Sequence, residues 1–232
     1  MNRKENNLIV ALDVDTFDEA KALVNSLSSV VDIFKVGSQL FTAYGPAVVQ
    51  YILEKRKKVF LDLKFHDIPN TVANAVSAAV GLKGVYMLTV HTLGGKEMLQ
   101  NAVEAATKKS KTLGVEKPLI VGITVLTSDD KLKDTSAIVL ERALLAKESG
   151  LDGVVASSQE AALIRRKLGK DFIIVTPGIR PSGSEAGDQK RVTTPAEAIN
   201  NGSNLLVVGR PIVKALDPLK VAQDILKEIN NI

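Results

Sequence analysis

Two carboxylates and an ammonium group stand close together in the segment Val59–Thr71, VFLDLKFHDIPNT, and residues of these types can carry acid–base or electrostatic catalysis. The first seven residues predict a buried strand, because most of them are apolar, β-branched or aromatic. Side chains alternate along a strand, so Asp62 and Lys64 should share one face. Buried charges are costly unless they are paired, and well-packed apolar residues often stabilise a core equally well. Stability alone therefore does not explain this pair.

A second carboxylate, Asp67, follows where the predicted strand gives way to a loop. Pro69 stands two residues later and suits the first turn of a helix. The Asp-x-Lys-x-x-Asp spacing thus brings two carboxylates and one ammonium group to the end of one strand. A structural ion pair at a strand end would give part of the same pattern. The rest of the chain must decide between the two interpretations.

The elements that would position these residues alternate along the whole chain. Short apolar runs predict strands, and segments with apolar residues every three or four positions lie between them. Helices are predicted over Thr71–Gly81 and Pro218–Ile229, and Thr16-x-x-Glu19 has the form of a capping box. The eight predicted strands are Leu8–Asp13, Asp32–Val36, Val59–Lys64, Gly84–His91, Leu119–Val125, Gly153–Ala156, Phe172–Thr176 and Leu205–Gly209.

The number of units predicts the fold. Dividing 232 residues among eight strand–helix units gives 29 residues per unit, close to the ~31 of a minimal eightfold barrel. Strands that are apolar on both faces agree with a parallel sheet covered by helices. We therefore predict an α/β protein, a (β/α)8 TIM barrel, with residues 1–232 forming a single domain. An open doubly wound sheet is the alternative, but no G-x-G-x-x-G follows the first predicted strand.

Composition excludes several kinds of site. The chain has no cysteine, so disulfides, thiol catalysis and cysteine-bound metals are excluded. Its 30 basic and 26 acidic residues give a net charge of +4 without a basic run between aromatics, so no nucleic-acid surface is indicated. No segment approaches a membrane span and the first apolar run is too short for a signal peptide, so we expect a cytoplasmic protein without membrane contact.

The two histidines do not indicate a metal site. His66 and His91 are far apart in the sequence and lack the H-E-x-x-H or H-x-H spacing of a ligand set. We expect both to be hydrogen-bonded structural residues rather than proton shuttles, because Lys64 already offers a proton donor.

Polar residues at the other predicted strand ends extend the candidate site, since the carboxyl ends of the strands form the active face of this fold. The first strand ends in Asp13, the second carries Lys35, and the fifth runs into Thr127. Together with the third strand they give a row of alternating charge, Lys–Asp–Lys–Asp. Such a row is what a site needs if it must hold charges in place before the reaction begins.

A second group of residues suits a phosphate. Barrels of this kind commonly bind phosphate on the loops after strands seven and eight. Here a long loop, Pro177–Val192, follows strand seven and carries Arg180 and Gln189. Strand eight ends in Gly209, which lets the backbone approach an anion, and Arg210, whose guanidinium can form two parallel hydrogen bonds to phosphate.

With these residues assembled, the chain resembles the orotidine 5'-monophosphate decarboxylase family over its whole length. The segment DLKFHDIPNT is the most specific part of the resemblance. The motifs that carry it are Ala11-Leu12-Asp13, Phe34-Lys35-Val36-Gly37, Asp62 to Thr71, Leu126-Thr127-Ser128, Thr176-Pro177-Gly178-Ile179-Arg180, Gln189 and Val208-Gly209-Arg210-Pro211-Ile212.

The resemblance implies a catalytic role for each member of the row. Lys64 would protonate carbon 6 of the pyrimidine as carbon dioxide leaves, and its charge would stabilise the developing carbanion. Asp62 would lie against the substrate carboxylate, and Lys35 and Asp67 would complete the row. A vinylic carbanion without an electron sink needs strong stabilisation, and preorganised charge is an available source.

The resemblance also implies the contacts that bind the substrate, orotidine 5'-monophosphate. Asp13 and Lys35 would bind the ribose hydroxyls and Thr127 the pyrimidine. The family uses no metal or organic cofactor and works as a homodimer, in which Asp67 and Thr71 reach into the neighbouring site. The residues implied at the phosphate end are Arg180, Gln189, Gly209 and Arg210.

Two other functions fit parts of this pattern. A magnesium-dependent decarboxylase or aldolase of sugar phosphates on the same barrel also uses D-x-K-x-x-D, but it places a glutamate ligand on strand two, where this chain has Lys35. A cation cannot bind Mg²⁺. A barrel that only binds nucleotides should lack the reactive lysine or the phosphate residues, and this chain has both.

Overall fold

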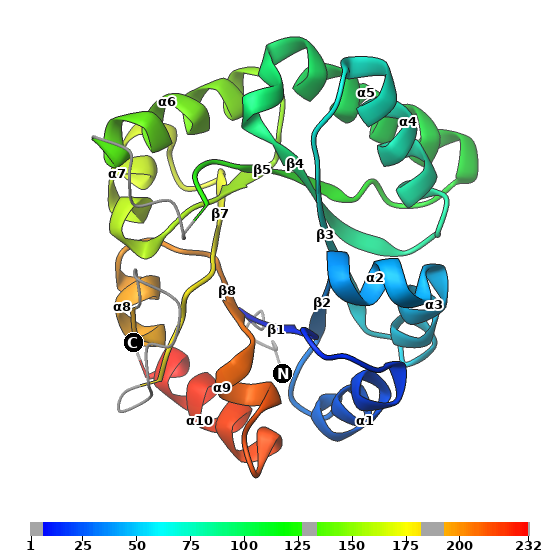
Figure 1. Ribbon diagram of the computed structural model, residues 1–232. Coiled ribbons are helices and arrows are strands. Elements are labelled where there is room, and N and C mark those ends of the chain that lie inside the picture. The colour runs from blue at the N-terminus through cyan, green and yellow to red at the C-terminus, as the bar shows by residue number, and fades with distance from the viewer. Residues whose placement is uncertain (1–6, 127–133, 182–192, 232) are drawn as a thin grey trace.

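Eight parallel strands pair in sequence order and close into a barrel in the computed structural model, which describes residues 7–126, 134–181 and 193–231 (Figure 1). The closing pair sets Val10 of β1 beside Val208 of β8, and on its other side Val10 pairs with Phe34. The predicted TIM barrel is confirmed. The strands are β1 (Leu8–Ala11), β2 (Ile33–Gly37), β3 (Lys58–Phe65), β4 (Val85–His91), β5 (Leu119–Ile123), β6 (Gly153–Val155), β7 (Ile173–Thr176) and β8 (Leu205–Val208).

Helices surround the barrel on its outer side (Figure 1). None of those that the structure describes is long and apolar enough to cross a membrane. They are α1 (Phe17–Leu27), α2 (Ser38–Tyr44), α3 (Pro46–Glu54), α4 (Pro69–Val80), the 3-10 turn η1 (Thr92–Gly94), α5 (Gly95–Leu113), α6 (Thr135–Glu148), α7 (Ser158–Leu168), α8 (Pro195–Asn200), α9 (Arg210–Val213) and α10 (Pro218–Asn230).

Local sequence signals fix several helix ends. The capping box is confirmed: the Thr16 hydroxyl accepts from the Glu19 N–H at 3.2 Å, and the Glu19 carboxylate accepts from the Thr16 N–H at 3.1 Å. Helix α4 starts at Pro69, two residues before the predicted start, because proline fits the first helical position. Gly81 caps its end as expected.

The core has two layers that the strand pattern separates. Phe60 points into the barrel and its neighbour Leu61 points out toward the helices, as alternation along β3 requires. Large apolar side chains thus fill both the barrel and the space around it. The buried residues inside the barrel are Ile9, Ala11, Ile33, Phe60, Met87, Val121, Val175 and Val207.

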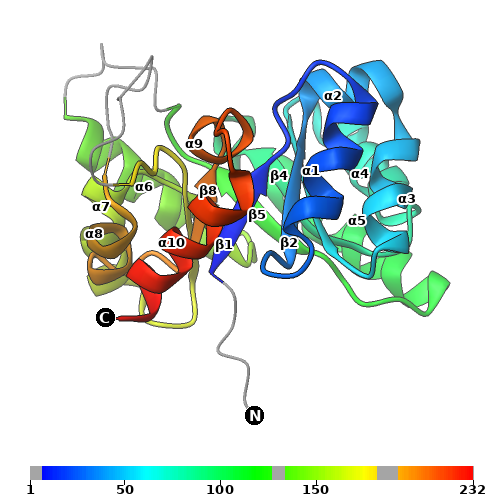
Figure 2. The same ribbon diagram turned by 90° about the horizontal axis from the view of Figure 1, so that it is seen from below.

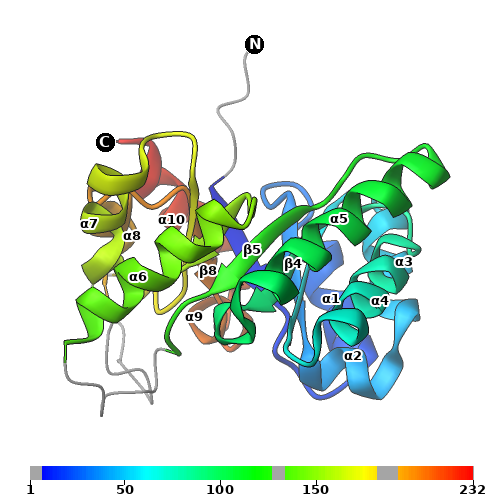
Figure 3. The same cartoon turned by 90° about the horizontal axis from the view of Figure 1, so that it is seen from above.

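Two short helices mark the end of the barrel that carries the site. Helices α2 and α9 follow β2 and β8 directly, and Figures 2 and 3 show both at the same end of the molecule, with the end of α10 at the opposite one. They have 7 and 4 residues, too few to show a helical period in the sequence, and the sequence analysis did not predict them.

Candidate active site

Four charged side chains form a row of alternating sign at the carboxyl ends of the first three strands. The Lys35 ammonium lies 2.9 Å from Asp13 Oδ1 and 3.7 Å from Asp62 Oδ2. The Lys64 ammonium lies 2.8 Å from the same Asp62 oxygen. Lys35 and Asp62 are buried, whereas 40% of the Lys64 side chain is exposed. Lys64 is therefore the cation of this row that is most open to a ligand.

An irregularity in β3 sets the direction of the Lys64 side chain. The register against β4 shifts between Leu61 and Phe65, and Lys64 has φ = 51°, a left-handed conformation that is uncommon for a residue with a side chain. Bulges of this kind often re-aim a side chain next to an active site. Asp62 and Lys64 still face the same cavity, as the strand pattern predicted.

Thr89 on β4 holds this strained segment through two hydrogen bonds. Its hydroxyl accepts from the Lys64 N–H at 2.8 Å and donates to Asp62 Oδ1 at 3.0 Å. The side chain is fully buried. Thr89 thus replaces the strand partner that the Lys64 N–H lacks, and it fixes the carboxylate between the two lysines. Sequence reasoning missed it, because a threonine inside a strand is an ordinary residue.

The row forms one wall of a cavity of about 580 Å³, a usual size for a small-molecule site. Apolar side chains from inside the barrel form its floor. The opposite wall is basic and comes from the segments after β7 and β8: Gly178, Arg180, Gly209, Arg210 and Lys214. The cavity can therefore hold a ligand with a polar reacting end, an apolar face and an anionic tail.

Backbone hydrogen bonds to Thr193 hold the part of the basic wall that follows β7. Arg180 donates its N–H to the Thr193 carbonyl at 2.9 Å, and Thr193 donates to Gly178 at 3.3 Å. Gly178 has φ = 80°, which favours glycine. The Arg180 guanidinium is buried and donates to the Ile179 carbonyl at 2.9 Å. Two predicted ligands, Thr127 and Gln189, lie outside the described residues.

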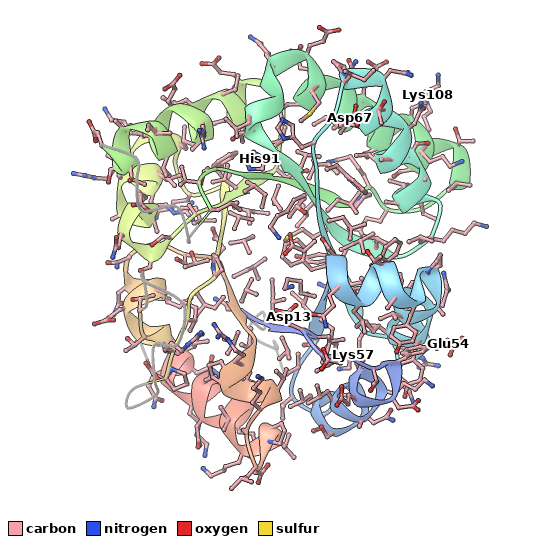
Figure 4. The ribbon with its side chains drawn as sticks, viewed as in Figure 1. Asp13, Glu54, Lys57, Asp67, His91 and Lys108 are labelled. Atoms are coloured by element: carbon pink, nitrogen blue, oxygen red, sulfur yellow. The ribbon has the colours of Figure 1, made fainter. Side chains whose placement is uncertain are left out.

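Asp67 and Thr71 lie apart from the cavity of their own chain. Both are exposed, and the described residues that line the cavity do not include them. Asp67 accepts from the Ile68 N–H at 2.6 Å, which holds its carboxylate on the turn that leads into α4. Figure 4 shows Asp13 near β1 and Asp67 beside α4, on the other side of the barrel opening.

Four further residues at or beside the cavity were not singled out from the sequence. Gln39, at the start of α2, donates to Asp15 Oδ1 at 2.7 Å, and both line the cavity. Lys214, at the end of α9, lines it next to Arg210. Gly37 leaves room for the ion pair, because a Cβ there would come within 3.0 Å of the Lys35 ammonium. Only the motif around Gly37 gave any signal in the sequence.

Within residues 7–126, 134–181 and 193–231, no group of three or more histidine, aspartate or glutamate side chains is placed to hold a metal ion.

Comparison with known proteins gives a consistent family. The sequence profile described as "Orotidine 5'-phosphate decarboxylase / HUMPS family" matches residues 6–225. Orotidine 5'-phosphate decarboxylase of Moorella thermoacetica is 50% identical over 234 residues, which cover 97% of this chain and 92% of that protein. The enzyme of the same name from Coxiella burnetii is 47% identical over 99% of both chains. The crystal structure of orotidine 5'-phosphate decarboxylase from Lactobacillus acidophilus matches with a TM-score of 0.83 and 36% identity, over 97% of this chain and 100% of that one.

Proposed function

The chain belongs to the orotidine 5'-phosphate decarboxylase / HUMPS family and is a carboxy-lyase that forms UMP from orotidine 5'-monophosphate, and we propose that the charged row performs this reaction without a cofactor. The observation that carries the mechanism is the alternating order Asp13–Lys35–Asp62–Lys64, in which Lys64 faces the open cavity.

Lys64 acts at the reacting carbon. The bond from carbon 6 of the pyrimidine to the carboxyl carbon breaks, carbon dioxide leaves, and the electron pair stays on carbon 6. The Lys64 ammonium stabilises this charge and then gives its proton to the same carbon, leaving a neutral amine that takes up a proton from solvent. A fixed ammonium is suited to this work, because it needs no reorganisation as the charge develops.

Asp62 acts on the ground state. Its carboxylate would meet the carboxylate of the substrate, and this repulsion is relieved when carbon dioxide leaves. Asp62 can keep its charge in this buried place because Lys64, Lys35 and the Thr89 hydroxyl all contact it. Asp13 and Lys35 then bind the ribose hydroxyls at the end of the row that lies away from the reacting carbon.

The basic wall binds the phosphate. Arg180, Gly209 and Arg210 stand across the cavity from the row, with Gln189 expected to join them. Phosphate lies far from carbon 6, so its binding energy can serve to place the pyrimidine against Lys64. Thr127 is assigned to the pyrimidine by the resemblance alone.

The active sites are shared across a homodimer in this proposal. Asp67 and Thr71 are exposed and lie outside the cavity of their own chain, so they are free to reach a partner's cavity. Two large apolar side chains on the same rim, Ile68 and Leu93, are 66% and 57% exposed. A twofold interface that covers them would carry Asp67 to the neighbouring row.

The sugar-phosphate activity also found on this barrel is less well supported. A divalent ion in such a site would be held by carboxylates on neighbouring strands. Here the Lys35 ammonium lies between Asp13 and Asp62, within 4 Å of both. A cation in that place competes with a metal ion.

The direct test is the loss of ultraviolet absorbance when purified protein meets orotidine 5'-monophosphate. We expect turnover that survives exhaustive chelation. A rate that chelators abolish and Mg²⁺ restores would move the chain to the sugar-phosphate group, and the absence of turnover would refute the proposed function.

The shared site predicts complementation between two inactive proteins. Lys64→Ala and Asp67→Ala proteins, mixed in equal amounts under conditions that exchange subunits, should regain activity. Half of the dimers are then mixed, and each mixed dimer has one intact site, so recovery should approach about a quarter of the parental rate. No recovery despite demonstrated exchange would place Asp67 in the same site as its own Lys64.

A further inference from the structure

The only two histidines of the chain stack on each other. The ring centroids of His66 and His91 are 5.2 Å apart and the ring planes differ by 27°. His66 lies on the turn between β3 and α4, next to Asp67, and His91 ends β4. Neither ring lines the cavity. A direct role on the substrate therefore does not explain why they meet.

His91 is the fixed member of the pair. Its Nδ1 accepts from the Leu93 N–H at 3.3 Å and caps η1, so this nitrogen carries no proton and the ring is neutral. The next residue, Thr92, donates its hydroxyl to the Ile123 carbonyl at 2.7 Å and ties η1 to β5. His66 is exposed on its turn. The stack thus joins an exposed turn to the barrel frame.

We propose that the stacked His66–His91 pair is a positioning device that holds the turn bearing Asp67 in place, and that it works while the His91 ring is uncharged. The inference rests on the proposed function, in which Asp67 completes the charged row of the partner's site. Figure 4 shows His91 and Asp67 on the same side of the barrel opening. A shift of the turn would move the Asp67 carboxylate, and misplacement of a catalytic group by about 1 Å can reduce a rate about a hundredfold.

The surroundings of His91 disfavour a positive charge. Burial lowers the pKa of His91 from its ordinary value of 6.5, and the nearby basic groups His66, Arg142 and Lys64 lower it further. They come from the turn, from α6 and from β3. Arg142 is anchored by its bond to the Thr124 carbonyl. A proton on Nδ1 would also break the bond from Leu93.

The pH dependence has a definite sign. When the pair opens, His91 is less buried and loses the nearby charge of His66, so its pKa rises toward 6.5 and the open form takes up a proton that the closed form resists. Above pH 6.5 His91 is neutral in both forms, so the closed form keeps its full stability relative to the open form. It loses stability as the pH falls from 6.5 to the lowered pKa of His91.

Substitutions of His66 separate stacking from charge. His66→Ala removes the ring, and we expect kcat/KM to fall about two- to tenfold at about pH 8, the range for loss of one aromatic contact. His66→Phe keeps a ring that can stack but cannot charge, so kcat/KM should remain near the parental value and its acid-side loss should become smaller, because His91 no longer meets the charge of His66. Parental kinetics for His66→Ala at every pH would refute the proposal.

A double-mutant cycle tests whether the pair acts through Asp67. In the Asp67→Ala background, His66→Ala should cause no further loss of the residual kcat/KM, because the group that it positions is gone. The same loss in both backgrounds would show that the stack acts elsewhere and would overturn the inference.

Because the chain has two histidines, ring resonances in an untagged protein give a readout that is independent of activity. The His91 ring should titrate below pH 6.5, and its titration should move to higher pH in His66→Phe. Titration of the His91 ring at its ordinary pKa of 6.5, unchanged in His66→Phe, would refute the pair. If the parent does not decarboxylate orotidine 5'-monophosphate, the proposed function fails, and this measurement still decides whether the rings are coupled.

Discussion

Charged groups are partly buried at both ends of the barrel, but they are satisfied in different ways. At the amino end, Asp152 Oδ2 accepts from the Lys117 ammonium and from the Ile120 N–H, both at 2.7 Å. At the carboxyl end, the hydrogen bonds that Asp62 accepts from the described residues come from side chains, from the Lys64 ammonium at 2.8 Å and from the Thr89 hydroxyl at 3.0 Å. Backbone partners thus tie the first carboxylate to the sheet itself.

Arg165 shows the same difference more strongly. Its guanidinium, on α7 at the amino end, donates to the carbonyls of Gly169, Lys170, Phe172 and Gly202, at distances from 2.7 to 3.2 Å. These contacts join the end of α7 to the segments before β7 and β8. Among the described residues, the Lys64 ammonium has one ion pair, and it has a face open to the cavity.

The difference separates stability from activity. A charge whose partners are backbone groups stabilises the connections between elements, and its loss leaves those groups without a partner. A charge in the row is held mainly by other charged side chains, so it can respond to a ligand that brings charge of its own. Substitutions at the amino end should lower stability, and those at the carboxyl end should lower activity.

The largest expected effect is that of Lys64→Ala. One residue supplies both proton and charge, so kcat should fall by several orders of magnitude, about 4 kcal/mol or more in the barrier. Binding of UMP, measured by calorimetry, should fall far less. The matched control at the amino end, Lys117→Ala, should keep its kcat. A Lys64→Ala rate within about tenfold of the parent, 1.4 kcal/mol, would remove Lys64 as the proton donor.

Arg210→Ala should have the next largest effect. We expect kcat/KM to fall by about 2–4 kcal/mol, the scale for removing one partner of a desolvated charge pair. Orotidine, which lacks the phosphate, should be a poor substrate for the parent and nearly indifferent to this change. If steady-state kinetics show equal losses with both substrates, Arg210 has a structural role.

Arg165→Ala tests the other end of the barrel. It should lower the free energy of unfolding by about 2–3 kcal/mol, because four backbone carbonyls lose a charged donor. Urea denaturation measures this change. Arg165→Lys should restore little of it, since an ammonium cannot reach carbonyls in several directions. A parental midpoint, or a fall in kcat of the folded protein, would break the separation between the two ends.

Much of the fold was predictable from short-range signals. The strands are apolar runs at regular spacing, and Thr16, Pro69 and Gly81 mark helix ends through chemistry that acts within a few residues. Three members of the predicted row, Lys35, Asp62 and Lys64, lie together because the fold brings strand ends together. Asp13 extends this row in the structure, whereas Asp67, the predicted fourth member, lies outside the cavity of its own chain.

Contacts that form only after folding were not predictable. Thr89 meets Asp62 across a register shift, and nothing near either residue in the sequence announces it. The same holds for the histidine stack, which joins positions 25 residues apart, 66 to 91. Lys214 is one lysine among many, and only the short helix α9 brings it to the cavity.

Lys214→Gln should give the smallest effect. It compares an exposed lysine with the arginines of the basic wall at the same end of the barrel. Lys214 is exposed at the cavity rim and forms no ion pair with the residues that the structure describes. Its attraction for a phosphate is screened by water and salt, so kcat/KM should fall only about two- to fivefold at low ionic strength.

High salt should remove most of that difference, and orotidine without phosphate should not show it. Lys220→Gln is the matched control, because Lys220 is also exposed but pairs with Asp224 at 2.7 Å on α10. Its kcat/KM should remain parental. A loss for Lys214→Gln that persists in high salt would mean that the ammonium contacts the phosphate directly, as the arginines are proposed to do. No loss at low salt would mean that Lys214 does not contribute to phosphate binding. The basic wall would then consist of the residues after β7 and β8 that are buried or point inward.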